Sequence, residues 1–257
     1  MKPILINSQY AVFDDALSPQ DHRAFWTMFR NLELQSVHAE GISRYYRPSD
    51  GAPYAGPSVA WTLKPIRSLL PPGATEADLP VRFHPTGDAT DAVIAAVAEA
   101  VGQCSALIGE RGSDWVGALC RSIAYPAHSG ISWHTDDTDV TGSFIYYGNP
   151  RWEVSWGGEL FVADEGSRFS MTRERAEHEF GNDVESELLL RRGFGSYVMP
   201  KPNRLIIVGQ GHPHKVAPVT ANAGDHVRAT FAGFFMPAAG VEALVRRALG
   251  AGSGASA

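Results

Sequence analysis

The sequence has little cysteine, no long apolar run and no excess of positive charge. Cys104 and Cys120 are the only two cysteines among 257 residues, which excludes a disulfide framework and favours a reducing compartment. The N-terminal apolar run stops at Asn7, so it is too short for the core of a signal peptide. No stretch approaches the roughly 20 apolar residues that a membrane-spanning helix needs. We therefore expect a cytoplasmic protein that does not associate with membranes.

Basic residues are also fewer than acidic ones. The chain has 22 Lys and Arg against 28 Asp and Glu, a net charge of −6, whereas nucleic-acid binding normally requires a basic face. We expect no nucleic-acid partner. At roughly 150 residues per domain, the length allows one or two domains. No repeat or low-complexity linker divides the chain, so we predict one domain over residues 1–250 and a disordered tail at 251–257.

The first 112 residues predict helices separated by a long loop. Ser18 followed by Pro19 is favourable for the start of a helix. A second helix is expected from Thr90 to Leu107, with an acidic first turn and apolar residues at helical spacing. Residues 44–80 are rich in Pro and Gly without periodicity, which indicates an ordered loop with short extended pieces. We expect a helical N-terminal part, residues 1–112.

From Trp115 onward the pattern becomes that of strands. Short β-branched and aromatic runs such as "ALCRSIAYP", "GSFIYYGN", "RLIIVGQG" and "VRATFAGFFM" alternate with Gly, Pro, Asn and Asp. Their number and spacing predict a sandwich or jelly roll over residues 113–237. The charged segment 164–195 is interpreted as an insertion or lid, and "GVEALVRRALG" as a short closing helix. The predicted fold class is α+β, mainly β, with N-terminal helices packed on the β core.

The stretch WHTDD contains a candidate pair of metal ligands, His134 and Asp136. Both follow an extended segment, and alternation along a strand places residues i and i+2 on the same face. The pair alone is a weak signal, since about half a His-x-Asp is expected by chance in a chain with nine histidines. His38 and Glu40 have the same spacing, and we interpret that pair as a decoy.

A third ligand has to come from elsewhere in the β region. His212 and His214 both lie in "GQGHPHKVAPV", directly after the apolar run "RLIIV". Two histidines and one carboxylate that leave open coordination positions suit non-haem Fe(II). Zinc also accepts these ligands, so the residue types do not identify the metal by themselves.

The surrounding residues resemble a known family. "AYPAHSGISWHTDDTDVTGSFIYYGNPRWEVSWGGELFV" and "PNRLIIVGQGHPHKVAPV…VRATFAGFF" are similar to the catalytic core of 2-oxoglutarate- and Fe(II)-dependent dioxygenases, in particular the prolyl-4-hydroxylase-like branch. A His-x-Asp, a Tyr-rich strand, Gly-Gly-Glu-Leu, a His-x-Val and a basic residue on the last strand occur in the family's order. The resemblance covers residues 115–236 and implies a double-stranded β-helix, which is a jelly roll.

The resemblance also implies which residues bind metal and co-substrate. His134, Asp136 and His214 match the three ligands, because the residues after His214 fit His-x-Val and those after His212 do not. Arg228 matches the basic residue that pairs with the far carboxylate of 2-oxoglutarate. This requires that the insert "TANAGD" forms a longer hairpin that returns Arg228 to the site.

Tyrosines are the remaining co-substrate candidates. Tyr146 and Tyr147 lie on the Tyr-rich strand, and alternation lets only one of them face inward. The family register favours Tyr147, with Tyr125 of "AYPAHSG" as a further tyrosine near the site. Ordinary strand packing is the alternative for both.

The implied activity is hydroxylation of an unactivated C–H bond with Fe(II), 2-oxoglutarate and O₂. The lack of a peptide-binding module favours a small-molecule substrate, such as an amino acid or a natural-product intermediate. Two alternatives stay open: a peptidyl hydroxylase that acts on a protein partner, and a non-catalytic metal-binding jelly roll. Four arginines could bind a substrate carboxylate or phosphate, although surface arginines are mostly solvated: Arg121, Arg168, Arg191 and Arg192. The sequence does not give the oligomeric state.

Overall fold

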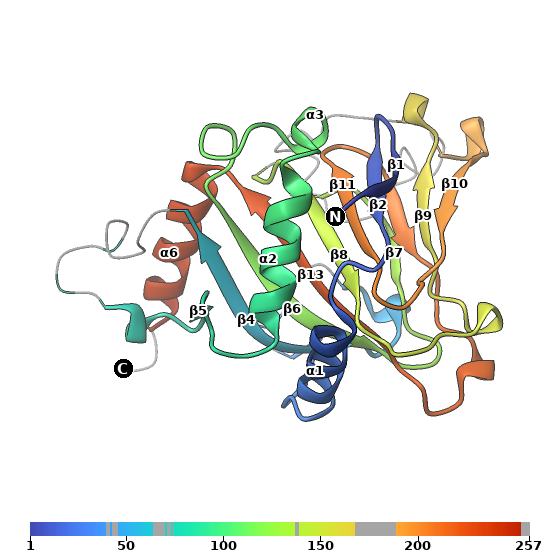
Figure 1. The fold of residues 1–257 in the computed structure, drawn as a ribbon, viewed down its shortest axis with the longest axis horizontal. Coiled ribbons are helices and arrows are strands. Elements are labelled where there is room, and N and C mark those ends of the chain that lie inside the picture. Colours follow the sequence, from blue (N-terminus) through green and yellow to red (C-terminus); the bar gives the residue numbers. More distant parts are fainter. Residues whose placement is uncertain are drawn as a thin grey trace.

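The computed structural model describes residues 1–39, 42, 46–63, 70, 73, 75–136, 139–167 and 189–252. Within these residues the chain is mainly β, with a nine-stranded and a four-stranded sheet and a few helices (Figure 1). All strand pairs are antiparallel except β4 with β5. The predicted mainly β class with few helices is confirmed.

The helices are α1 (Pro19–Arg30), α2 (Thr90–Val101), α3 (Ser105–Ile108) and α6 (Ala238–Gly252), with single 3₁₀ turns at η1 (Pro48–Asp50), η3 (Glu76–Asp78), η4 (Val154–Trp156), η5 (Glu165–Ser167) and η6 (Ala221–Ala223). The nine-stranded sheet contains β1 (Pro3–Ile6), β2 (Tyr10–Phe13), β3 (Gln35–Ser36), β4 (Tyr54–Thr62), β5 (Arg82–Phe83), β6 (Gly117–Tyr125), β8 (Gly142–Tyr147), β11 (Leu205–Gly209) and β13 (Arg228–Met236). The four-stranded sheet contains β7 (Ile131–His134), β9 (Leu160–Ala163), β10 (Gly195–Val198) and β12 (His214–Val216).

The helix α1 begins where the sequence predicts. The Ser18 side chain caps it by accepting a hydrogen bond from the backbone N–H of Asp21 at 3.1 Å, and Pro19 is the first helical residue. The second predicted helix, by contrast, does not run unbroken to Leu107. It ends at Gly102, a poor helix former, and a separate turn, α3, follows.

The predicted division at residue 113 is wrong, because the N-terminal part is not only helical. It contributes β1 to β5 to the same sheet as β6, β8 and β13. The predicted loop at 44–80 contains the long strand β4, which pairs with β6. Pro57 is tolerated there because it is exposed at a register shift between Ala55 and Ser58, where the hydrogen-bond ladder is interrupted.

The two sheets pack face to face. A buried cluster joins side chains of the nine-stranded sheet to side chains of the four-stranded sheet: Tyr10, Val12, Tyr147, Ile206 and Val208 from the former, and Leu160, Val162, Val198 and Val216 from the latter. We call the side of the nine-stranded sheet that carries this cluster its inner face, and the opposite side its outer face. The candidate site lies on the inner face.

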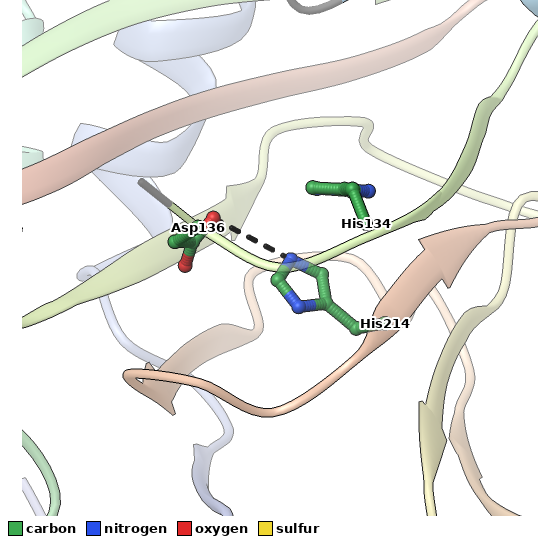
Figure 2. Close-up of side chains that lie close together, drawn as sticks. All are labelled: His134, Asp136 and His214. Atoms are coloured by element: carbon green, nitrogen blue, oxygen red, sulfur yellow. Dashed lines mark ion pairs between the residues drawn. The ribbon is translucent and has the colours of Figure 1, made fainter. Parts of the chain in front are cut away.

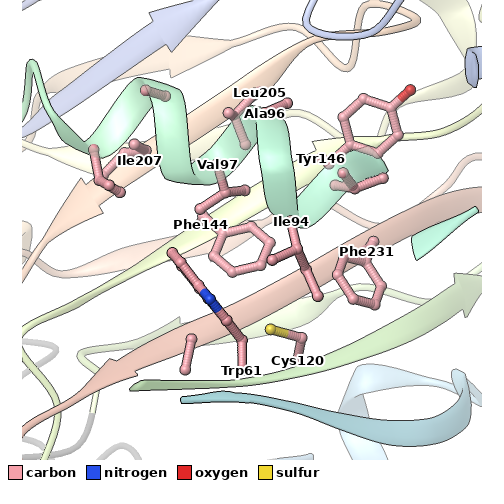
Figure 3. Packing of buried hydrophobic residues seen from close by; sticks show 14 of the residues in the cluster. Trp61, Ile94, Ala96, Val97, Cys120, Phe144, Tyr146, Leu205, Ile207 and Phe231 are labelled. Atoms are coloured by element: carbon pink, nitrogen blue, oxygen red, sulfur yellow. The ribbon is translucent and has the colours of Figure 1, made fainter. Parts of the chain in front are cut away.

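The outer face is covered by helices α1 and α2, as predicted (Figure 1). Figure 3 shows Ile94 and Val97 of α2 packed against Phe144 of β8 and Phe231 of β13, all of them at most 1% exposed. Burying these side chains removes apolar surface from water at roughly 25 cal/mol per Å². This layer therefore supplies most of the apolar burial that holds the sheet in place.

Two further predictions fall largely outside the described residues. Of the interpreted insertion at 164–195, residues 168–188 are not described, and its end forms the beginning of β10, paired with β9. Ala251 and Gly252 of the predicted disordered tail belong to α6, and residues 253–257 are not described. Among the described residues, no helix is long and apolar enough to cross a membrane.

Candidate active site

His134, Asp136 and His214 come together at β7, an edge strand of the four-stranded sheet, and its neighbour β12. His134 ends β7 and His214 begins β12, and their Cα atoms are paired across the two strands. Asp136 follows two residues after His134. One ligand atom from each of the three side chains lies within 4.8 Å of the others. Figure 2 shows the three side chains close together. The structure thus brings together the three residues that the sequence pattern selects.

Both histidines present the same ring nitrogen to this point. Nδ1 of His134 lies 2.7 Å from the carbonyl oxygen of Ser132, and Nδ1 of His214 lies 2.9 Å from that of His212. A carbonyl oxygen only accepts, so both Nδ1 atoms carry the hydrogen and both Nε2 atoms keep a free lone pair. Backbone carbonyls orient metal-binding histidines in this way.

Asp136 is buried and is held by a residue that the sequence did not single out. Its Oδ2 accepts a hydrogen bond from the Ser143 hydroxyl at 2.7 Å, and its Oδ1 lies 3.7 Å from Nε2 of His214. One carboxylate oxygen is therefore fixed and the other faces the histidines. Ser143 is on β8, two residues before Ile145 and four before Tyr147, so alternation along that strand could have identified it as inward-facing.

The electrostatics keep the imidazole of His134 neutral. Burial, assisted by the adjacent His214, lowers the pKa of His134 to about 4, against the opposing effect of Asp136. A neutral imidazole is the form that binds a metal ion. Two imidazoles and one carboxylate with a free oxygen form a donor set that fits a divalent cation such as Fe(II).

A second carboxylate supports the strand that carries His134. Asp50 of η1 is buried, and its Oδ1 accepts hydrogen bonds from the backbone N–H of Ser132, at 2.8 Å, and from the Ser132 hydroxyl. Ser132 in turn provides the carbonyl that orients His134. No sequence signal indicated Asp50, because it lies in a Pro- and Gly-rich stretch far from β7 along the chain.

The two alternative histidines lie elsewhere. The His212 ring is buried with its Nδ1 3.5 Å from Nε2 of Gln9, and it does not belong to the cluster. Nε2 of His38 lies 2.9 Å from the carbonyl oxygen of Gly51, and Glu40, its predicted decoy partner, lies outside the described residues.

Arg228 lies on the inner face, at the start of β13, where it pairs with Tyr125 of β6. The hairpin with the extra turn η6 therefore does return it to the sheet. Its side chain is 1% exposed, and its guanidinium carbon lies 4.8 Å from the ring centroid of Tyr147 and 5.1 Å from that of Tyr125.

Arg228 and Tyr147 have unsatisfied polar atoms. Within the described part of the chain, neither Nε nor Nη2 of Arg228 nor the hydroxyl of Tyr147 has a hydrogen-bond partner, although all are buried. Such groups normally find partners, because leaving them unpaired is costly. A planar fork of N–H donors beside a hydroxyl fits a carboxylate.

The second glycine of the Gly-Gly-Glu-Leu motif, Gly158, leaves space for the Arg228 side chain. A Cβ on Gly158 would lie 2.7 Å from Cδ of Arg228, closer than real side chains approach, and Gly158 has φ +78°. Only glycine adopts this conformation at no steric cost. The Gly-Gly-Glu-Leu motif therefore also has a packing role, which its sequence alone did not indicate.

The tyrosines divide between the two faces of the sheet. Tyr147 faces Arg228, whereas Tyr146 points to the outer face, where its hydroxyl lies 2.6 Å from Nδ1 of His22. The hydroxyl of Tyr125 lies 2.7 Å from that of Tyr46. Burial raises the pKa of Tyr125, so its hydroxyl stays protonated at neutral pH.

Of the four candidate substrate arginines, only Arg121 lies on the inner face within the described residues. Arg191 and Arg192 are exposed, and Arg192 pairs with Asp164. Arg168 lies outside the described residues.

Comparison with known proteins agrees with this geometry. Residues 120–236 match the sequence model of the 2OG-Fe(II) oxygenase superfamily, and this range contains the triad, Arg228, Tyr125 and Tyr147. No curated protein sequence matches the chain significantly.

Solved structures of low sequence identity share the fold. A prolyl-4-hydroxylase from Pseudomonas putida is 16% identical with a TM-score of 0.53, covering 88% of this chain and 92% of its own. A prolyl hydroxylase from Trichoplax adhaerens, in complex with a hypoxia inducible factor peptide fragment, is 13% identical with a TM-score of 0.54, covering 90% and 85%. The epimerase SnoN from nogalamycin biosynthesis is 12% identical with a TM-score of 0.53, covering 89% and 78%.

The matched segment and the donor set lead to the same assignment. The superfamily uses Fe(II), 2-oxoglutarate and O₂, and the residues present fit both the metal and the co-substrate carboxylate. Residues 120–236 therefore form a 2OG-Fe(II) oxygenase domain, that of a 2-oxoglutarate-dependent dioxygenase, and prolyl-4-hydroxylases are among the structural relatives of the chain.

Proposed function

We propose that this enzyme hydroxylates an unactivated C–H bond of a small molecule, an amino acid or a natural-product intermediate. His134, Asp136 and His214 hold Fe(II), and Arg228 with Tyr147 binds the far carboxylate of 2-oxoglutarate. The observation that carries this proposal is the buried pair of Arg228 and Tyr147, whose polar atoms have no partner among the described residues and whose chemistry matches a carboxylate.

The reaction takes 2-oxoglutarate, O₂ and R–H to succinate, CO₂ and R–OH, and the bound metal with these two co-substrates supplies its oxidising chemistry. The protein contributes positioning. The carbonyls of Ser132 and His212 keep both Nε2 atoms available, and Ser143 fixes the Asp136 carboxylate. Tyr125 lies against the guanidinium of Arg228 and helps to hold the fork in place.

The wider architecture belongs to the same proposal. Two facing antiparallel sheets, with the triad at the adjacent strands β7 and β12 of the smaller one, are consistent with a double-stranded β-helix. We propose one domain over residues 1–250, because β1 to β5 complete the sheet of residues 113–237. The cytoplasmic location stays a prediction, for which the two free, buried cysteines are the support.

A peptidyl hydroxylase is the second candidate. The observation that favours it is the structural likeness to two prolyl hydroxylases, one of them solved with a peptide. The likeness to SnoN, an enzyme of nogalamycin biosynthesis, points the other way. An assay that compares product formation from free small molecules with product formation from peptides distinguishes these two candidate functions.

The test is an anaerobic titration of the metal-free protein with Fe(II) and then 2-oxoglutarate, recorded by visible absorption. We expect the charge-transfer band that arises when a 2-oxo acid chelates Fe(II). Asp136→Ala should lose this band and hydroxylation together while the protein stays folded. His38→Ala is the matched control, because His38 has the same His-x-acid context outside the cluster, and it should keep the band.

Two results would contradict the proposal. If Fe(II) binds without the band, the assignment of Arg228 and Tyr147 to 2-oxoglutarate fails. If Asp136→Ala retains full activity, the ligand assignment fails, whatever the substrate is.

A further inference from the structure

Two arginines lie on the inner face of the nine-stranded sheet, and the proposed function uses only Arg228. Arg121 lies on β6 four residues before Tyr125, so alternation puts both side chains on the inner face. On β13 its paired residue is Ala232, and the residue paired with Ala232 on β8 is Ile145. Arg121 is therefore level with the middle of β8.

The middle of β8 lies between the two halves of the site. Ser143, on one side of Ile145, bonds to Asp136, and Tyr147, on the other side, contacts Arg228. Arg121 is two strands away from this point, about 10 Å at the usual strand spacing. Arg121 also precedes Tyr125, the partner of Arg228, by four residues, about 13 Å along the strand. It is thus too far from Arg228 to share the same carboxylate.

Arg121 is oriented by hydrogen bonds, and among the described residues no carboxylate compensates its charge. Its Nε and Nη2 donate to the Ser58 hydroxyl at 3.1 and 2.5 Å, and its Nη1 donates to the carbonyl of Ile42 at 2.5 Å. Both acceptors are neutral, and no carboxylate in the described part of the chain pairs with it. Burial lowers the pKa of Arg121, and the nearby Tyr46 opposes this effect.

The surroundings of Arg121 favour an ion pair. Two of its inner-face neighbours, Ile123 on its own strand and Ala232 paired with it on β13, are apolar and half-buried. A charge pair in such a setting is screened less than at the surface. Hydrogen bonds to described residues use three of the five guanidinium N–H groups, so these residues leave two for an incoming group.

We infer that Arg121, held in place by Ser58, binds an anionic group of the primary substrate, a carboxylate or a phosphate. This rests on the proposed function, because the bond to be hydroxylated has to reach the triad. The substrate then places its anionic group on β6, on the order of 10 Å from the strand that faces the metal ligands.

The experiment uses the full chain, loaded anaerobically with Fe(II) and 2-oxoglutarate, and measures binding by calorimetry. The probes are matched pairs of a carboxylic acid and its carboxamide: the L-amino acids, their N-acetyl derivatives and straight-chain monoacids of about four to ten carbons, together with alkyl phosphates. We expect acids or phosphates to bind. Arg121→Met should weaken their affinity about 10- to 100-fold, the effect of losing a charge-assisted hydrogen bond. Arg121→Lys keeps the charge and should lose less.

A structural role for Arg121, holding the backbone at Ile42, has a different outcome. The inference is wrong if Arg121→Met also loses the binding of carboxamides and the 2-oxoglutarate band. It is wrong as well if this variant binds the anions with the same affinity as the unchanged protein. It is also wrong if the unchanged protein binds none of the anions. Arg151→Met, a change at an exposed arginine paired with Glu153, is the control and should leave binding unaltered.

Failure of the inference can be told from failure of the proposed function. Loss of anion binding in Arg121→Met with an intact charge-transfer band supports both. An absent band in the unchanged protein contradicts the proposed function alone, because the preference for acids over carboxamides is still measurable in the metal-free protein.

Discussion

The two faces of the nine-stranded sheet differ in how their polar groups are satisfied. On the outer face, the Tyr146 hydroxyl bonds to both His22 and Asn203, amid apolar side chains from α1 and α2. On the inner face, the Tyr147 hydroxyl and two nitrogens of Arg228 are buried without partners among the described residues. On the outer face the chain itself supplies the hydrogen-bond partners of Tyr146, whereas the polar groups of Tyr147 and Arg228 on the inner face need a ligand as their partner.

This difference has an energetic meaning. Outer-face burial stabilises the fold, while unpaired donors on the inner face cost stability in the ligand-free protein. Binding sites commonly carry such a cost. Substitutions on the two faces should therefore separate into changes in the free energy of unfolding and changes in ligand affinity.

The largest expected effect is on the outer face. Phe231 is fully buried, with its ring centroid 6.3 Å from Phe25 and 6.0 Å from Phe144. Phe231→Ala leaves a cavity and should lower the free energy of unfolding by about 3–5 kcal/mol, measured by urea denaturation of the metal-free protein. The folded fraction should still bind 2-oxoglutarate. A loss below about 1 kcal/mol would mean that this face is not the main source of stability.

Arg228→Met should have the opposite profile. Removing the guanidinium should weaken 2-oxoglutarate about 100-fold, because a charge-assisted contact to carboxylate is lost. The stability of the metal-free protein should stay the same or increase, since the unpaired buried donors are gone while the side-chain stem remains. The charge-transfer band reports the affinity and urea denaturation the stability. A loss of stability as large as that of Phe231→Ala would remove the distinction between the faces.

Ser143→Ala tests the support of the metal site. It removes the hydrogen bond to Asp136 and should weaken Fe(II) binding about 10-fold or more, as is typical for groups that orient metal ligands. Anaerobic Fe(II) titration measures this change. Ser113→Ala, at an exposed serine, is the control and should bind Fe(II) unchanged. Equal affinity in both variants would contradict the positioning role.

How far the sequence predicts this molecule depends on the range of the interaction. His134 and Asp136 are recognisable as a candidate pair because strand alternation is a local rule, whereas only the resemblance to His-x-Val selected His214 over His212. β4 was missed because Pro57 lies at a bulge, and a bulge depends on the pairing with β6. Asp50 was missed for a similar reason, since only the tertiary fold brings it to Ser132.

The test with the smallest expected effect removes one tyrosine hydroxyl from each face of the sheet. Tyr146 and Tyr147 are neighbours on β8, both at most 1% exposed, so Tyr→Phe removes the same atom from the same strand in each case. Tyr146→Phe loses hydrogen bonds that the chain itself provides and should cost about 1 kcal/mol of stability with unchanged 2-oxoglutarate affinity.

Tyr147→Phe removes a hydroxyl that has no partner in the ligand-free protein, within the described residues, so stability should not fall. Its loss should instead weaken 2-oxoglutarate about 5-fold, the equivalent of about 1 kcal/mol. Thermal unfolding without metal and titration of the charge-transfer band together give both quantities for each variant. If the two variants behave alike, the inner-face hydroxyl is ordinary strand packing, which is the alternative that the sequence left open for Tyr147. If they differ in the expected directions, a single-residue step along β8 separates a group that holds the fold from a group that holds the co-substrate.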